Sequence, residues 1–211
     1  QYGVEQFDQC LVSIYIDIVH MSGDYAGAVE IADRFLQGHS KSEIEENEFL
    51  AMMRVRKIHH SMFYKPVQGL VEESLGIYAV MDERYPKVMN ELLFLIGGNL
   101  GVLNGEWPSV YKWLKKSEDF AQRYALSDYS KRNTRKLADY YCHEGDYDLA
   151  METIFKYAKY DEPIKGRYEN YLIGALANIY TCRGDFDEAL QCYDSVLQYS
   201  TAKGIIGWAA H

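Results

Sequence analysis

The sequence has few prolines, few cysteines and no stretch of low complexity. Only 4 of its 211 residues are Pro, and its 16 Gly are scattered, so it contains no segment typical of a flexible linker. Four cysteines (Cys10, Cys142, Cys182 and Cys192) in a chain of this length do not form the dense disulfide framework of a small secreted domain. This cysteine usage favours a reducing, cytoplasmic location.

Positive charge is also scarce. The chain has 22 Lys and Arg against 31 Asp and Glu, which gives a formal net charge of −9. Nucleic acids and anionic membranes attract basic surfaces, so neither is expected as the main partner. The most apolar stretch, Val88–Leu103, is shorter than the ~20 residues of a membrane-spanning helix. It predicts a buried central helix, whose glycines indicate close packing or a local bend.

Motifs of catalysis are missing from the chain. There is no His-Glu-x-x-His, no glycine-rich phosphate loop, no Cys-x-x-Cys and no Gly-x-Ser-x-Gly. The pairs His59-His60 and Cys142-His143 consist of adjacent residues, which point in different directions on a helix. The sequence therefore predicts no catalytic residue, no metal site, no cofactor and no enzymatic activity.

What the chain does contain is a repeated segment. A glycine is followed by an acid, by an aromatic residue two places on, and by a small or branched apolar residue five places on. The copies begin at Gly23, Gly105, Gly145 and Gly184. These glycines lie 82, 40 and 39 residues apart, so a degenerate copy is expected between the first two. A fixed period near 40 residues is typical of a repeat array.

Each copy reads as a helix, a tight turn and a second helix. Glycine lacks the Cβ atom that clashes in the left-handed conformation at a helix end. The acid after it can cap the next helix by accepting hydrogen bonds from free N–H groups. Asp185 and Glu188 have the spacing of a capping box, as do Ser42 and Glu45, which predict a single helix from Ser42 to about Ser61. A turn is expected near Tyr64-Lys65-Pro66.

The order leucine, small residue, tyrosine, glycine around these turns resembles the tetratricopeptide repeat (TPR) family. It stands at Leu137-Ala138, Tyr141 and Gly145, and again at Leu176-Ala177, Tyr180 and Gly184. The resemblance implies an all-α fold, an α–α superhelix in a single TPR-like domain of about five helix-turn-helix units and a truncated sixth. The expected units are 5–38, 42–84, 87–126, 128–162 and 167–200, with the start of a sixth at 202–211.

The last residues motivate the sixth unit. Ile205-Ile206-Gly207-Trp208-Ala209-Ala210-His211 parallels Leu172-Ile173-Gly174-Ala175-Leu176-Ala177-Asn178. Together with the missing initial Met, this parallel predicts that the chain is a fragment of a longer protein.

In the TPR family the first helices of the units line a concave groove that holds peptides. Carried over to this chain, the resemblance places apolar Leu92 and Leu95 on the groove wall together with the polar candidates. The candidate partner-binding residues are Asn99, Arg132, Arg135, Lys136, Asp139, Tyr171 and Asn178. Some family members clamp a C-terminal carboxylate with cations and asparagines. Arg132, Lys136 and Arg54 or Arg56 match the cations, but Ile96, and Ile58 or His60, replace the asparagines.

The basic cluster formed by Lys131, Arg132, Arg135 and Lys136 has two readings: it attracts acidic groups of a ligand, or it balances the acidic surface of neighbouring units. The function predicted from the resemblance is a non-catalytic scaffold that binds a protein or peptide partner. The alternative is a signal-sensing regulatory domain of a larger transcription regulator or signalling enzyme. Self-association into a homodimer through the last helix is a third reading.

Overall fold

A computed structural model describes residues 4–81, 83–159 and 162–204. Every regular element in these residues is helical, so within the described ranges the expected all-α architecture holds. The elements are α1 (Val4–Met21), α2 (Tyr25–Gln37), α3 (Lys41–Glu46), α4 (Glu48–Ser61), α5 (Val67–Val80), α6 (Pro86–Phe94), the π-helical segment η1 (Leu95–Gly101), α7 (Trp107–Arg123), α8 (Ser127–His143), α9 (Tyr147–Phe155), α10 (Arg167–Arg183) and α11 (Phe186–Ala202).

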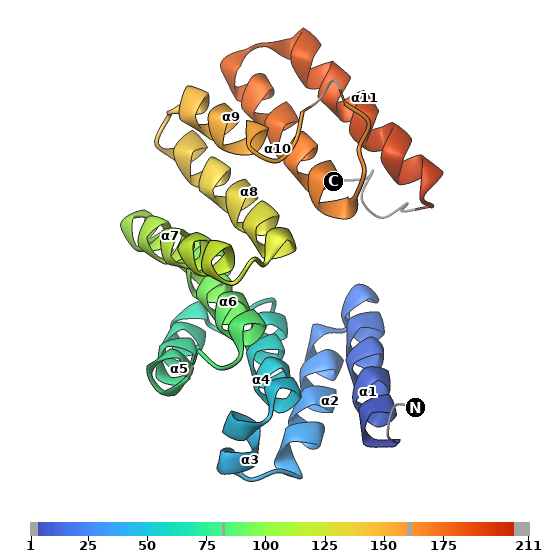
Figure 1. The fold of residues 1–211 in the computed structure, drawn as a ribbon, viewed down its shortest axis with the longest axis vertical. Helices are drawn as coiled ribbons and strands as arrows, with labels where there is room; N and C mark the ends of the chain where they lie inside the picture. The colour runs from blue at the N-terminus through green and yellow to red at the C-terminus, as the bar shows by residue number, and fades with distance from the viewer. Residues whose placement is uncertain (1–3, 82, 160–161, 205–211) are drawn as a thin grey trace. The chain divides into compact units, whose positions relative to one another are not determined.

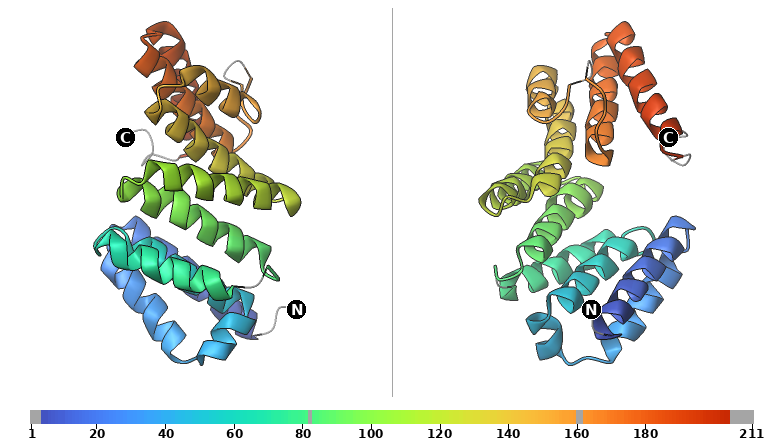
Figure 2. Two further views of the ribbon diagram at one scale, coloured as in Figure 1. Left: turned by 90° about the vertical axis from the view of Figure 1, so that its left-hand side faces the viewer. Right: turned by 45° about the vertical axis from the view of Figure 1, so that its right-hand side comes forward.

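The chain forms two compact units, residues 1–113 and 114–211, and the boundary lies within α7. In the first unit, α1, α2 and α4 bury one apolar cluster that includes Ile16 and Met53. In the same unit, α4, α5, α6 and η1 bury a second cluster that includes Ile77. In the second unit, α8 to α11 (yellow to red in Figure 1) share one cluster that includes Ile154 and Leu172. Figure 2 shows the helices of each unit from two further directions.

The glycines of the repeat end helices in the left-handed conformation, as the sequence predicts. Their φ angles are +88° at Gly23, +72° at Gly105, +80° at Gly145 and +86° at Gly184. After α10, the N–H of Gly184 donates to the carbonyl of Thr181 at 3.2 Å, and the N–H of Asp185 donates to the carbonyl of Tyr180 at 2.9 Å. These two bonds define a Schellman motif, which satisfies carbonyls that the helix end leaves open.

The same motif occurs after α7 without a glycine. The N–H of Ala125 donates to the carbonyl of Gln122 at 3.1 Å, and the N–H of Leu126 donates to the carbonyl of Ala121 at 2.8 Å. Ala125 consequently has a φ of +53°, which an L-residue adopts only at a cost in free energy. This turn has no signal in the sequence because it lacks the glycine that marks the others.

The aspartates of the repeat act as caps in two of three cases. Asp24 accepts from the N–H of Gly27 at 2.8 Å, and Asp146 accepts from the N–H of Leu149 at 3.0 Å. The capping box predicted at Asp185 and Glu188 is wrong, since Asp185 makes no side-chain cap bond to α11. Its carboxylate lies 3.0 Å from Nε of Arg183 instead, and a charge-assisted contact competes well with a cap.

The single helix predicted from Ser42 to about Ser61 is also wrong. Asn47 separates α3 from α4, because its side chain accepts from the N–H groups of Phe49 at 2.9 Å and Leu50 at 3.1 Å. The capping box that starts α3 joins Ser40 and Glu43 rather than Ser42 and Glu45. The local competition of an asparagine side chain with the helix backbone therefore overrides the continuous apolar pattern.

Two other predictions for the first unit are confirmed. The turn near Tyr64-Lys65-Pro66 connects α4 to α5. The apolar stretch Val88–Leu103 is helical and largely buried, and its backbone widens into η1 where the glycines lie. A Cβ atom on Gly101 would come within 2.9 Å of Cγ2 of Val110, so close packing requires a glycine at this place.

The long helices follow one another as five successive pairs in the described part of the chain. The pairs are α1 with α2, α4 with α5, α6 and η1 with α7, α8 with α9, and α10 with α11. Helix α11 extends to Ala202. Residues 205–211, on which the predicted sixth unit depends, lie outside the described residues.

A histidine contact joins α1 to α4. The Nδ1 atoms of His20 and His60 are 2.9 Å apart, so one ring donates and the other accepts. His60 is only 5% exposed. Burial, followed by the nearby charges of His20, His59 and Arg56, lowers the pKa of His60 to about 3. Burial also lowers the pKa of His20, although Asp17 opposes this shift.

Exchanging glycine and alanine at two left-handed turns tests the turn geometry. We expect Gly184→Ala to destabilise the fold and Ala125→Gly to stabilise it, each by about 0.5–1 kcal/mol, because only glycine adopts a positive φ without strain. Melting temperatures from circular dichroism measure the effect. Gly174→Ala, inside α10 where a Cβ would meet no atom within 4 Å, is the control and should not lower the melting temperature. A lower melting temperature for Ala125→Gly would contradict the assignment.

The pH dependence of stability tests the histidine contact. The unfolded chain takes up a proton on His60 near pH 6.5, whereas the folded chain does so only at about pH 3. The contribution of neutral His60 to stability is therefore full above pH 6.5 and is lost as the pH falls toward 3. Between pH 7 and pH 5 the melting temperature of the unmodified chain should fall by several degrees more than that of His60→Gln. The exposed His143→Gln serves as control, and parallel curves for all three chains would contradict the role of His60.

Candidate functional site

Helices α8 and α10 bring together most of the residues that the sequence selected. Asn133, Leu137 and Ala138 anchor α8 in the core. The half-buried Arg132, Arg135, Lys136 and Asp139 lie beside these anchors at intervals of three or four residues, which keeps them near one another along the helix. From α10, Tyr171 meets Arg135. We call Arg132, Arg135, Lys136, Asp139, Arg167 and Tyr171 the α8–α10 face.

Tyr171 lies between two guanidinium groups. The guanidinium carbon of Arg135 is 5.7 Å from the centre of its ring, and that of Arg167 is 5.5 Å away. Nε of Arg167 also donates to the Tyr171 hydroxyl at 2.8 Å. Burial raises the pKa of Tyr171, although Arg167 and Arg135 oppose this shift. These contacts hold both cations against a neutral ring by cation–π attraction.

Arg135 is the cation best suited to a ligand. Its Nε atom is buried and has no hydrogen-bond partner in the described part of the chain. A buried donor without an acceptor costs free energy. An acceptor supplied by a ligand would therefore stabilise this side chain.

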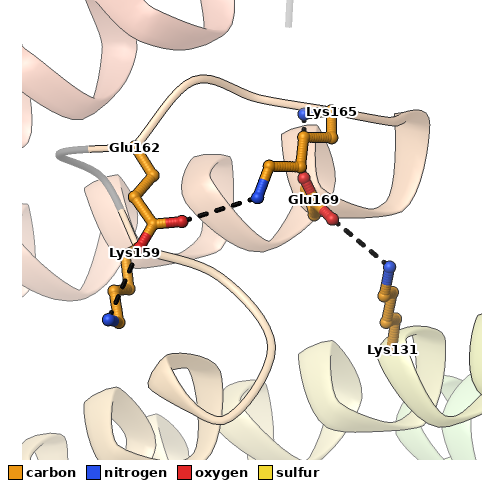
Figure 3. A network of polar contacts seen from close by, with 5 residues as sticks. All are labelled: Lys131, Lys159, Glu162, Lys165 and Glu169. Atoms are coloured by element: carbon orange, nitrogen blue, oxygen red, sulfur yellow. Dashed lines mark hydrogen bonds and ion pairs between the residues drawn. The ribbon is translucent and has the colours of Figure 1, made fainter.

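The lysines of the basic cluster are engaged within the chain. Nζ of Lys136 is 3.6 Å from Asp139, and Nζ of Lys131 is 3.3 Å from Glu169. Figure 3 shows Lys131 reaching Glu169, whose other oxygen accepts from the backbone N–H of Lys165 at 2.8 Å. Glu162 lies in the same loop, 3.4 Å from Lys159 and 3.6 Å from Lys165. For the lysines, the reading of a cluster that balances neighbouring acids fits the structure.

The remaining predicted residues lie apart from this contact. Asn178 is exposed, and its Oδ1 accepts from the hydroxyl of Tyr193 in α11 at 2.7 Å. It stands seven residues, or about 10 Å along α10, from Tyr171. Asn99 belongs to the first unit, where its amide nitrogen is 3.4 Å from Nδ1 of His59.

Sequence reasoning missed two residues of this region, Arg167 and Tyr129. Arg167 lies four positions before Tyr171. Tyr129 lies three positions before Arg132, whose guanidinium carbon is 4.8 Å from the centre of the Tyr129 ring. Both spacings place the paired side chains on one side of a helix, so the signal was present in the sequence.

The incomplete carboxylate clamp gains nothing from Arg56. Its NH1 atom is 3.5 Å from Asp17 and donates to Ser13 at 2.7 Å. This guanidinium is thus engaged by helix α1 of its own unit.

Metal and membrane sites were also sought in the described ranges. No group of three or more His, Cys, Asp or Glu side chains there could hold a metal ion. None of the described helices is long and apolar enough to cross a membrane.

Comparisons with known proteins agree with the architecture. Residues 172–203 match the model of a tetratricopeptide repeat, whereas no curated protein matches the chain in sequence. A point variant of a kinesin light chain-like protein from Podosopora anserina, built of nearly identical TPR-like repeats, has a similar structure. It aligns with a TM-score of 0.65 at 15% identity, over 96% of this chain and 99% of that one.

A second solved structure is similar to a comparable degree. BtubC (BKLC) from P. vanneervenii aligns with a TM-score of 0.62 at 14% identity, over 92% of this chain and 80% of that one. At such identities the likeness concerns the fold. The predicted fold class is thereby confirmed: the protein has an all-α, TPR-like fold and carries one recognisable tetratricopeptide repeat at residues 172–203.

Proposed function

We propose that the α8–α10 face binds an acidic segment of a protein or peptide partner. TPR-like repeats are general scaffolds for protein–protein interaction, and the fold supports this class of function. The observation that carries the proposal is the position of Arg135, held against Tyr171 with a buried Nε that lacks an acceptor in the described part of the chain.

A carboxylate is the ligand group that fits this arrangement best. A guanidinium donates two parallel hydrogen bonds to a carboxylate, and stacking on an aromatic ring fixes the plane from which it donates. Arg135 and Arg167 both contact Tyr171. An acidic side chain or a C-terminal carboxylate placed beside this ring can therefore accept from one guanidinium while it is attracted by the other.

The local charge supports an acidic ligand in spite of the overall charge of −9. Within and beside the face stand the five cations Lys131, Arg132, Arg135, Lys136 and Arg167, against the two carboxylates Asp139 and Glu169. A positive region on an acidic molecule attracts an acidic segment to one place and repels it elsewhere, which favours specificity more than raw affinity. Asn178 extends the proposed surface along α10, and Asn99 stays a prediction for the first unit.

We further propose that the protein acts by binding rather than by catalysis, in the cytoplasm. Burial raises the pKa of Cys142 and of Cys192 to about 11 in each case. Both thiols therefore stay protonated at neutral pH and are poor nucleophiles. Cys142, Cys182 and Cys192 are free thiols, a state typical of a reducing compartment.

The test is a direct binding measurement with a defined probe. A fluorescein-labelled peptide with four consecutive glutamates should bind the protein, as measured by fluorescence anisotropy at low salt, and its glutamine counterpart should bind at least about tenfold more weakly. Arg135→Glu should reduce the affinity for the glutamate peptide by about tenfold or more, a loss of ~1.4 kcal/mol. Arg135→Lys should fall between the two, because lysine keeps the charge and loses the planar fork.

The matched control is Lys156→Glu, which makes the same charge reversal at an exposed position after α9. It should alter the affinity by less than about twofold. If Lys156→Glu weakens binding as much as Arg135→Glu, the attraction depends on net charge alone and the proposed site is wrong. Circular dichroism checks that each variant retains its helical content.

A further inference from the structure

The last described helix carries an exposed apolar stripe. Phe186 is 63% exposed, Leu190 61%, Tyr193 42% and Leu197 50%. Their spacing of four, three and four residues places them on one side of α11. The opposite side packs into the core of the second unit through Ala189 and Cys192. A row of four large apolar side chains in water is unusual for a soluble domain and indicates a contact surface.

The equivalent stripe on α9 is covered. Counted from the glycines of the two turns, 39 residues apart, its members are Tyr147, Met151, Ile154 and Ala158. Ile154 is fully buried, Ala158 is 8% exposed, and the other two are partly buried against the same cluster. Helix α10 belongs to this cluster and packs on α9. A second helix of the array is therefore covered by the segment that follows it.

The covering helix runs antiparallel to the helix it covers. Arg183, the last residue of α10, has NH1 3.0 Å from Asp148 and 3.5 Å from the sulfur of Met151, both near the start of α9. The beginning of α10 accordingly lies near the end of α9. By the same rule, a segment that covers α11 begins near Leu197 rather than near Phe186.

The chain turns at the right place for such a segment. Gly204 has a φ of +66°, and its N–H donates to the carbonyl of Thr201 at 3.1 Å. Ala125 adopts the same conformation after α7, and α8 begins two residues later. In that connection, Ser117 of α7 and Asn133 of α8 meet in a buried hydrogen bond of 3.0 Å. A left-handed turn therefore folds the next segment back onto the helix before it.

We propose that the segment Ile205–His211 docks on the Leu197 end of the α11 stripe. Its sequence, Ile-Ile-Gly-Trp-Ala-Ala-His, supplies Ile205, Ile206 and Trp208 as apolar groups. Seven residues span about 10 Å as a helix, whereas the stripe from Phe186 to Leu197 spans about 16 Å. The segment therefore covers Leu197 and part of Tyr193. This docking is independent of the partner-binding function proposed above.

A second copy of the chain fits the stripe less well. Asp187, Glu188 and Asp194 are exposed or half-buried acidic residues of α11. Two such helices placed face to face would bring these carboxylates together, and juxtaposed like charges disfavour association. The segment Ile205–His211 has no acidic residue, so it covers the stripe without this repulsion.

The fluorescence of Trp208 tests the docking. The difference between the emission spectra of the chain and of Trp208→Phe isolates this residue. Docking predicts emission at shorter wavelength than that of free tryptophan, and Leu197→Glu should shift it to longer wavelength. Leu103→Glu, the same change at an exposed leucine of the first unit, should leave it unchanged. Emission like that of free tryptophan in the unmodified chain would overturn the proposal.

A double-mutant cycle gives a second readout with milder substitutions. Leu197→Ala and Trp208→Ala should each lower the melting temperature by a few degrees, and together by clearly less than the sum, because each removes the same contact. Leu103→Ala combined with Trp208→Ala should be additive. Additivity in the first pair would overturn the proposal even if Leu197→Glu failed to fold. Sedimentation should show a monomer at all concentrations, whereas a dimer that Leu197→Glu dissociates would assign the stripe to a second copy instead.

Discussion

The left-handed turn at the end of a helix is the constraint on which the described hairpins depend. Two backbone hydrogen bonds close it, as at Gly184 and Asp185, and they fix the direction in which the next helix starts. Once that direction is fixed, small residues such as Ala177 and Ala189 let the paired helices approach and bury their apolar sides. The turn contributes little contact area of its own, yet the cluster around Ile154 forms only because the helices meet there.

The sequence predicted the turns where a glycine marks them and failed where side chains compete. Ala125 adopts the same conformation without the residue type that signals it. Asn47 interrupts a helix because its side chain satisfies two backbone N–H groups at once. Asp185 has the spacing of a cap, but Arg183 is close enough to engage it. In each case the outcome depends on two alternatives of similar free energy, which a pattern of residue types does not rank.

The candidate site was predictable in part for the same reason. The spacing of Arg132, Arg135 and Asp139 was sufficient to place them on one side of α8. Their partners were not predictable, because Tyr171 lies 36 residues beyond Arg135 in the sequence and meets it only through the packing of α10 on α8. That packing separates the basic cluster into two kinds of cation. The lysines pair with Asp139 and Glu169, and Arg135 lies on a ring.

The π-helical segment Leu95–Gly101 has a consequence for how the repeat is counted. A π-turn closes its hydrogen bonds over five residues instead of four, so it contains about one residue more than a regular turn. Residues before and after the segment are therefore out of phase by about one residue, roughly 100° of rotation. This phase shift accounts for the nearly unbroken burial from Val88 to Leu100. A helix that changes phase midway directs apolar side chains toward two neighbouring surfaces in turn, and no single amphipathic stripe describes it.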